Sequence, residues 1–252
     1  MNRTLYQFPL SHYCEKARWL LDFKDLDYKV TNLFPGAHRV LTVWKANSTT
    51  VPTLNDGQEW IGDSTEMAFY LDAKYVLRPL LPSDPEQRRQ AIILEEKADK
   101  AGIHVRRWAY SQLLATPQVT DLLFDDYPLI KPFKKPLAPF IRRGIAQMYQ
   151  VNPEKGAQSF AKMMMMAEEF ETVLLKNGGR YLVGHHLGLA DIAVASLYAP
   201  LMTIPETPWA SLHASTEAVQ QLQHELSARP LGQWLLRLYR EERHARGNWR
   251  GQ

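Results

Sequence analysis

Residues 4–24 read TLYQFPLSHYCEKARWLLDFK, and the pattern changes from strand to helix within them. Thr4 to Phe8 is a short run of strand-favouring residues, and Tyr13 to Lys24 carries apolar residues at helical spacing. Ser11 lies between the two runs, where the start of a helix leaves backbone N–H groups unpaired. The sequence therefore predicts a strand, a turn around Ser11 and a helix.

The rest of the first eighty residues continues this alternation. Further strands are predicted at 28–33, 51–54 and 59–61, with the turn Asn55-Asp56-Gly57 between the last two. Asp63-Ser64-Thr65-Glu66 has the spacing of a capping box, and a helix is predicted to continue from 67 to 75. A β-α-β unit followed by β-β-α is an α/β arrangement of thioredoxin size.

A proline-rich segment then separates the α/β pattern from a pattern that contains only helices. Pro79, Pro82 and Pro85 indicate a linker over 79–85, so we expect an α/β domain at 1–78 and an all-helical domain at 86–252. In the second domain, prolines at 128, 132, 136 and 139 predict a loop or broken connection. Helices are expected at 86–114, 140–149, 154–176, 189–198 and 218–243.

Composition narrows the function classes. The 252 residues include 30 Lys and Arg against 27 Asp and Glu, so the net charge of +3 does not favour a nucleic acid or a membrane as partner. The single cysteine, Cys14, excludes an intramolecular disulfide and favours a reducing compartment. No export signal is recognised, and the most apolar stretch, 190–204, is short of the ~20 residues that span a bilayer. We expect a cytoplasmic protein.

Ser11 and Cys14 occupy the turn that holds Cys-x-x-Cys in redox proteins, with serine in the first cysteine's place. A serine here donates its hydroxyl to a ligand's sulfur or serves only as the helix N-cap, and the local sequence leaves both open. Val51-Pro52 precedes a short strand, where a cis proline would leave the Val51 backbone free to pair with an extended peptide. Asp63-Ser64 opens a helix whose amides can bind a carboxylate.

Taken together, these motifs resemble the N-terminal domain of a glutathione S-transferase of the cytosolic, serine type. Ser-x-x-Cys, Val-Pro-x-Leu and Asp-Ser occur in the family's order. Leu182-Val183-Gly184 and Leu189-Ala190-Asp191-Ile192-Ala193 resemble its C-terminal folding motif, with Asp191 as a buried helix-capping carboxylate. The resemblance extends from Leu5 to about Tyr198 and implies a thioredoxin-like domain followed by an all-helical domain.

The resemblance implies a glutathione transferase that joins the glutathione thiolate to electrophilic, largely apolar small molecules. Ser11 would be the catalytic residue that holds the thiolate. Glutathione would be a co-substrate, with no cofactor or metal, and the protein a homodimer. The other glutathione-binding residues would be Val51, Pro52, Asp63 and Ser64, together with His38 and Arg39. Gln7 stands where tyrosine-type classes carry their catalytic hydroxyl.

Several features leave alternatives open. Cys14 is either a buried packing residue or a redox group, which would make the chain a glutathione-dependent thiol-disulfide oxidoreductase. Residues 45–50, KANSTT, lack the family's proline and lysine, as would suit a non-catalytic binding or scaffold protein. Gly188 replaces the usual serine or threonine before Asp191. We read His185-His186 as a turn and not a metal site.

In the helical domain, Trp108, Tyr110 and Phe124 are candidates for the co-substrate pocket or for the core. We expect Met163 to Met166 to be divided between core and surface, because four consecutive helical residues point around most of the helix. The arginines from Arg237 to Arg250 are expected to form a solvated tail. The identity of the electrophile cannot be read from these residues.

Overall fold

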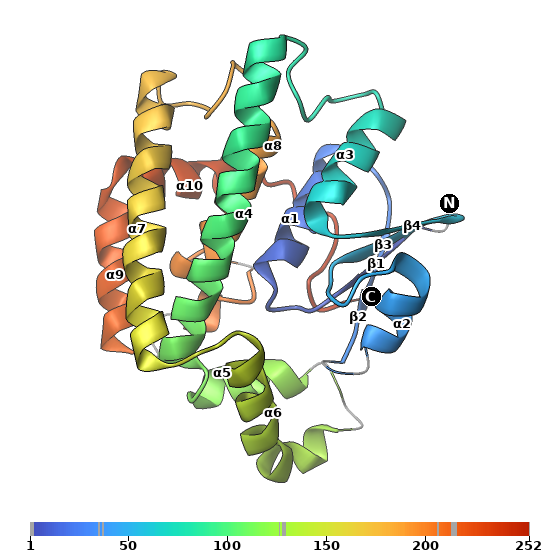
Figure 1. The fold of residues 1–252 in the computed structure, drawn as a ribbon, viewed down its shortest axis with the longest axis vertical. Helices are drawn as coiled ribbons and strands as arrows, with labels where there is room; N and C mark the ends of the chain where they lie inside the picture. Colours follow the sequence, from blue (N-terminus) through green and yellow to red (C-terminus); the bar gives the residue numbers. More distant parts are fainter. Residues whose placement is uncertain are drawn as a thin grey trace.

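The computed structural model describes residues 3–34, 36, 38–125, 127, 130–205, 207–212 and 216–251. Its first part is a four-stranded sheet of order β2-β1-β3-β4 (Figure 1). Strand β1 is parallel to β2 and antiparallel to β3, and β3 is antiparallel to β4. Leu5 of β1 pairs with Val30 and Leu54, and all three side chains are buried. The strands are β1 Arg3–Gln7, β2 Lys29–Asn32, β3 Thr53–Asp56 and β4 Glu59–Gly62.

Three helices belong to this part of the chain: α1 His12–Phe23, α2 His38–Ala46 and α3 Ser64–Lys74. Helix α1 lies between the sheet and the second part of the molecule, and it packs against α3 and α8 (Figure 1). Ten of its twelve residues are buried. The predicted order, a β-α-β unit followed by β-β-α, is thereby confirmed, and α2 is an additional helix that the sequence analysis did not predict.

The regular elements described in the second part are all helices, and the first is α4, whose N-cap Asp84 accepts a hydrogen bond from the Gln87 N–H. Helices α4, α7 and α8 pack together, and all ten residues of α8 are buried. Asp191 accepts hydrogen bonds from the N–H groups of Leu182 and Gly188 and is buried, as expected of the capping carboxylate. The helices are α4 Pro85–Leu113, α5 Pro117–Asp125, α6 Lys134–Met148, α7 Pro153–Lys176, α8 Leu189–Tyr198, α9 Glu217–Ala228 and α10 Pro230–Glu241.

The proline-rich stretch differs from the sequence prediction. Helix α6 starts at Lys134 and contains Pro136 and Pro139, so the prediction of a loop through Pro139 was wrong. Pro136 lies in the first turn, where a missing N–H costs nothing, and Pro139 removes only one intrahelical hydrogen bond. The predicted helix at 218–243 is in fact two, because Pro230 begins a new helix directly after α9.

The expectation that the arginines from Arg237 to Arg250 form a solvated tail was wrong for Arg243, whereas Arg240, Arg246 and Arg250 are exposed as expected. The chain returns to the sheet-bearing part, and its C-terminal end lies beside β2 (Figure 1). The Arg243 side chain is 5% exposed and forms ion pairs with Glu15 and Asp22 of α1 at 2.8 and 2.6 Å. Gln7 donates a hydrogen bond to the Trp249 carbonyl at 2.9 Å. The segment from Arg243 to Gly251, here called the C-terminal strap, is therefore attached to α1 through Arg243 and to β1 through Trp249, although several of its side chains are exposed.

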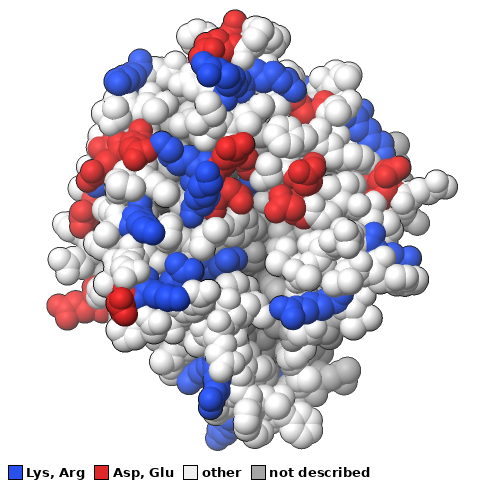
Figure 2. Space-filling view, viewed as in Figure 1, with Lys and Arg blue, Asp and Glu red and all other residues white. Residues whose placement is uncertain are grey.

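Other expectations concern the surface and the core. Met163 is buried and Met165 is half exposed, as the helical geometry predicted. Among the described residues, no helix is long and apolar enough to cross a membrane, and no three His, Cys, Asp or Glu side chains are grouped as a metal site would require. Figure 2 shows basic and acidic side chains interspersed over one face of the molecule.

Candidate functional site

A cleft of about 320 Å³ lies between the sheet-bearing part and the helical part. It brings together five of the predicted site residues from distant places in the sequence. Ser11, Val51, His38 and Arg39 line one wall, and Tyr110 of α4 lines the other. The rest of this second wall comes from α4, α5 and α6, through Arg106, Leu122, Leu123, Ile145, Met148 and Tyr149.

Ser11 is the N-cap of α1, and its Oγ accepts a hydrogen bond from the Cys14 N–H at 3.4 Å. This contact occupies a lone pair of the oxygen and leaves the hydroxyl proton without an acceptor among the described residues. The N–H groups of His12 and Tyr13 follow directly in the first helical turn, where such groups have no partner within the helix. The N-cap role and the ligand role therefore do not exclude each other. Ser11 can cap the helix and donate its proton into the cleft at the same time.

Cys14 points away from the cleft into the core. Its side chain is fully buried, and burial raises the pKa of its thiol. Because the thiolate is the form that attacks disulfides, this environment suits a packing residue better than a redox group.

The Val51–Pro52 peptide bond is cis, as expected from the sequence. Val51 lines the cleft, and its backbone N–H and C=O have no hydrogen-bond partner in the described part of the chain. The Asp63 N–H donates to the Pro52 carbonyl at 3.3 Å and so ties the start of α3 to this loop. An extended peptide lying along residue 51 would find one donor and one acceptor available.

Asp63 and Ser64 open α3 beside that loop, although they do not line the cleft itself. Asp63 has φ of 74°, and its carboxylate caps α3 by accepting from the N–H groups of Thr65 and Glu66 at 2.7 and 3.3 Å. The Ser64 side chain is buried, and its Oγ has no hydrogen-bond partner in the described structure. A buried hydroxyl without a partner costs about 1–3 kcal/mol, so this oxygen is suited to a ligand group.

A buried ion pair between α1 and α4 holds the start of α3 in place. Lys16 of α1 contacts the carboxylate of Glu95 in α4, and the Lys16 Nζ also donates to the Thr65 Oγ1 at 3.1 Å. The Thr65 hydroxyl in turn donates to Glu95 at 2.6 Å. These contacts connect α1, α3 and α4 and fix Ser64 relative to Ser11.

His38 and Arg39, at the start of α2, differ in what they can offer a ligand. The His38 Nδ1 accepts from the Gly36 N–H at 3.1 Å, so its Nε2 carries the proton and donates to the Thr49 carbonyl at 3.2 Å. Burial lowers the pKa of His38, in keeping with a neutral ring. Arg39 is exposed at the mouth of the cleft. Arg39 is thus the better candidate for a carboxylate, and His38 holds the loops together.

Of the three pocket candidates named in the helical domain, only Tyr110 lines this cleft. Tyr110 lines the cleft and stacks on Tyr149, with the ring centroids 5.6 Å apart. Trp108 lies in a separate recess against Phe160, so the structure does not bring it to Ser11. Phe124 is fully buried in the core.

Two polar residues of the cleft were missed by the sequence analysis. Arg106 of α4 lines the cleft, with its guanidinium carbon 4.0 Å from the centroid of the Tyr149 ring. His12 is buried beside Ser11, its Nε2 lies 3.0 Å from the Gly102 carbonyl, and burial followed by the charge of Arg106 lowers its pKa to about 3. No local motif marks either residue, because both depend on how α1 meets α4.

Gly102 explains how those two helices come so close. A Cβ at this position would lie 2.9 Å from the Tyr13 hydroxyl and 3.2 Å from the His12 Nε2. The absence of a side chain lets α1 approach α4, which places Arg106 and Ser11 in one cleft.

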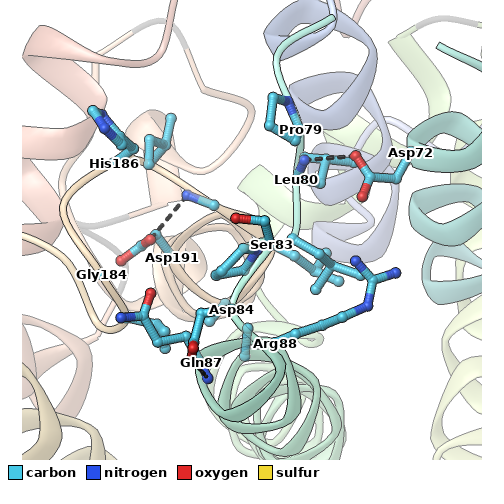
Figure 3. A pocket seen from close by; sticks show the side chains of 18 of the residues that line it. Asp72, Pro79, Leu80, Ser83, Asp84, Gln87, Arg88, Gly184, His186 and Asp191 are labelled. Atoms are coloured by element: carbon cyan, nitrogen blue, oxygen red, sulfur yellow. Dashed lines mark hydrogen bonds between the residues drawn. The ribbon is translucent and has the colours of Figure 1, made fainter. Parts of the chain in front are cut away.

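A second recess, of about 530 Å³, lies between the linker and the start of α8 (Figure 3). Its two central carboxylates are already engaged: Asp72 accepts from the Leu80 N–H at 2.6 Å, and Asp191 accepts from the Gly188 N–H at 3.0 Å. Asp72 also forms an ion pair with Lys24 at 2.8 Å. These bonds fasten the linker and cap α8, so we assign this recess a structural role.

The electrostatics of the first cleft favour an anion. Arg39 and Arg106 are its charged lining residues, and no Asp or Glu is among the described residues that line it. The N-terminus of α1 adds a partial positive charge at Ser11, which stabilises anions by about 0.3–1 kcal/mol. The cleft therefore combines anion stabilisation at Ser11 with an apolar wall from α5 and α6.

Comparisons with known proteins agree with this arrangement. Residues 5–79 match the family described as "Glutathione S-transferase, N-terminal domain", and residues 141–233 match "Glutathione S-transferase, C-terminal domain". The chain is 39% identical over 87 residues to Glutathione S-transferase 1 of Dianthus caryophyllus and 40% identical over 87 residues to Glutathione S-transferase Z2 of Arabidopsis thaliana. Each of these matches covers 33% of this chain and 39% of the relative.

Solved structures share the fold over nearly the whole chain. Glutathione transferase GSTFuA3 from Phanerochaete chrysosporium has a TM-score of 0.66 at 18% identity, and the match covers 95% of this chain and 96% of that one. A glutathione S-transferase from Methylobacterium radiotolerans, in complex with glutathione sulfonate, has a TM-score of 0.58 at 19% identity, covering 92% and 93%. At these identities the likeness concerns the fold alone.

Proposed function

Because the chain belongs to the glutathione S-transferase family, we propose that it is an enzyme that transfers glutathione to electrophilic, largely apolar small molecules. The observation that carries this proposal is a row of unpaired polar groups. The Ser11 hydroxyl proton, the Val51 backbone and the buried Ser64 Oγ all lack partners among the described residues. They suit the sulfur, the cysteinyl backbone and the γ-glutamyl carboxylate of the tripeptide.

In the proposed reaction, Ser11 donates a hydrogen bond to the glutathione sulfur and favours its thiolate. The unbound thiol has a pKa of ~8.5 and is mostly protonated near neutral pH. The unpaired N–H groups at the start of α1 stabilise the same charge. The thiol proton passes to water, the thiolate attacks an electrophilic carbon, a C–S bond forms, and the leaving group departs with its electron pair. No metal or further cofactor enters this scheme.

Glutathione is proposed to lie along the sheet-bearing side of the cleft, with Pro52 and Asp63 shaping its site and Arg39 available to its glycine carboxylate. Tyr110 and the apolar side chains of α5 and α6 face the second substrate. We take 1–78 as the glutathione-binding domain and 86–252 as the domain of the second substrate. A homodimer in the cytoplasm is inferred from the family, and light scattering would test the oligomeric state.

Thiol exchange by Cys14 is the weaker alternative, because the buried thiol has a raised pKa and no exposure to the cleft. A Cys14→Ser protein that lost a disulfide reductase activity present in the wild type would revive this alternative.

The decisive experiment is an ultraviolet titration of thiolate absorbance with glutathione bound to the wild type, Ser11→Ala and Ser11→Thr. Hydrogen bonds to a charged group contribute about 1.5–3 kcal/mol, so Ser11→Ala should raise the pKa of the bound thiol by about one unit or more. Turnover should fall by about 10- to 100-fold, while glutathione affinity changes little.

Ser11→Thr keeps a hydroxyl and an N-cap, so its turnover and the pKa of its bound thiol should both stay close to the wild-type values. Undiminished turnover in Ser11→Ala would refute the serine assignment. If millimolar glutathione fails to bind the wild type, the transferase proposal itself is wrong.

A further inference from the structure

Arg106 has an unusual position for an arginine that is largely enclosed by protein. It projects from α4 into the cleft that holds Ser11, and it also lines a smaller adjoining recess of about 40 Å³ with Trp209. Its guanidinium carbon lies 4.0 Å from the centroid of the Tyr149 ring and 5.5 Å from that of Tyr13. Its Nε is buried and has no hydrogen-bond partner among the described residues.

The three arginines whose side chains are at most 5% exposed are paired with carboxylates. Arg3 contacts Asp56 at 3.1 Å, Arg18 contacts Glu15 at 2.6 Å, and Arg243 contacts Glu15 and Asp22. Arg106 has no ion pair within the described structure, and no carboxylate there lines its cleft. Removing a cation from water without an anionic partner is costly, and aromatic rings compensate for only part of that cost. Arg106 is partly exposed and lines the cleft, so its guanidinium is available to an anion that enters the cleft.

Glutathione brings carboxylates of its own, but the proposed places for them lie elsewhere. Ser64 and the start of α3 belong to the sheet-bearing part, and Arg39 lies at the mouth of the cleft on the same side. Arg106 belongs to the opposite wall. Its neighbours there are Tyr110, Ile145 and Met148, which would contact the second substrate.

We propose that the second substrate is an apolar electrophile bearing a carboxylate, and that the Arg106 guanidinium binds this carboxylate. The inference rests on the proposed transferase function and names the substrate class of that same cleft. Arginine forms two parallel hydrogen bonds with a carboxylate, and the Tyr149 ring behind the guanidinium holds it in one plane. The two groups together orient the electrophilic carbon toward Ser11.

The test uses two aryl halides of nearly equal shape, 4-chloro-3-nitrobenzoate and 4-chloro-3-nitrobenzamide. The kcat/KM of each is divided by its uncatalysed rate with glutathione, which removes their difference in intrinsic reactivity. Wild type, Arg106→Met, Arg106→Lys and Arg88→Met are compared. Arg88 is an exposed arginine of the same helix outside the cleft, so Arg88→Met makes the same change in charge away from the site.

We expect the wild type to prefer the carboxylate by about tenfold or more, as a charged hydrogen bond predicts. Arg106→Met should abolish this preference, Arg106→Lys should keep part of it, and Arg88→Met should not alter it. An equal loss for both halides in Arg106→Met would overturn the inference and assign Arg106 to the thiolate. Preference for the amide in the wild type would overturn it as well.

A binding measurement separates failure of this inference from failure of the transferase proposal. Titration calorimetry with unreactive 3-nitrobenzoate and 3-nitrobenzamide reports on Arg106 even if neither halide is conjugated. Binding of the benzoate that is lost in Arg106→Met but kept in Arg88→Met supports the carboxylate site independently of catalysis. Conjugation of the amide without any binding of the benzoate would refute the carboxylate site and leave the transferase function standing.

Discussion

Helix α1 meets polar groups on two sides, and the two sides differ in how those groups are satisfied. On the strap side, Glu15 and Asp22 are buried against Arg243, with Arg18 and Tyr28 completing the contacts. On the cleft side, the Ser11 proton, the Ser64 Oγ and the Arg106 Nε have no partner among the described residues. Paired charges hold the strap side together, whereas the site proposed for the ligands offers polar atoms that are still free to bind.

The largest expected effect is on the strap side. Arg243→Met should lower the free energy of unfolding by about 3–5 kcal/mol, because Asp22 would stay buried without a cation and Glu15 would keep only Arg18. Urea unfolding measures this directly. Arg240→Met is the matched control, since Arg240 is exposed and pairs only with Glu241 at the surface, and it should cost less than about 1 kcal/mol. Equal, small effects of the two substitutions would show that the strap adds no stability.

The second prediction concerns acid. Burial alone would raise the pKa of Glu15, but Arg243 and Arg18 outweigh burial and lower it to about 2. Because the folded pKa lies below the unfolded value of 4.5, the stabilisation is complete above about pH 4.5 and is lost as the pH falls toward 2. Its full size is about 3 kcal/mol.

Denaturant unfolding of the wild type and Glu15→Gln across this range measures the Glu15 contribution. Asp22 must be kept in both proteins, because its pKa is raised by burial and responds in the opposite direction. The difference in unfolding free energy between the two proteins should shrink steadily as the pH falls. A difference that does not depend on pH would contradict the assigned pairing of Glu15.

The smallest expected effect concerns Ser64, whose buried hydroxyl is proposed to bind glutathione and not to stabilise the fold. Ser64→Ala should weaken glutathione binding by about 3- to 30-fold, while leaving the free energy of unfolding equal or up to about 1 kcal/mol higher, because a buried hydroxyl without a partner is removed. Ser196→Ala is the control. Ser196 is likewise fully buried with an unpartnered Oγ, but it belongs to α8 and not to the start of α3, where the γ-glutamyl carboxylate is proposed to bind.

Calorimetry with glutathione and urea unfolding together distinguish the two serines. Both substitutions should have similar effects on stability, but only Ser64→Ala should change glutathione affinity. Unchanged affinity in Ser64→Ala would remove Ser64 from the site.

The contrast between the two sides of α1 also explains which structural features could be predicted from the sequence. Strand β1, the Ser11 turn and α1 follow from local patterns, because the residues that determine each of them lie close together in the sequence. The same is true of the cis Val51–Pro52 bond and the α3 cap at Asp63. These features include most of the sheet-bearing wall of the cleft.

The opposite wall and the strap were missed for a different reason. Helix α6 contains prolines that locally argue against a helix, yet the chain tolerates Pro136 in its first turn and one lost hydrogen bond at Pro139. Arg243 looks like a solvated residue until its partners, Glu15 and Asp22, are seen more than 220 residues earlier in the chain. No sequence motif marks Arg106, and its proposed role rests on the absence of an ion pair among the described residues, which only a three-dimensional structure reveals.

The C-terminal strap has a consequence for the order of events during protein synthesis. The ribosome completes the sheet and α1 long before it reaches Arg243, so until then Glu15 is paired only with Arg18, and Asp22 lacks the cation that it has in the finished protein. Until then, burying them in α1 is unfavourable, and the nascent first domain is held short of its final packing. A stop codon or a bulky fusion placed just before Arg243 would therefore damage the domain at the opposite end of the gene.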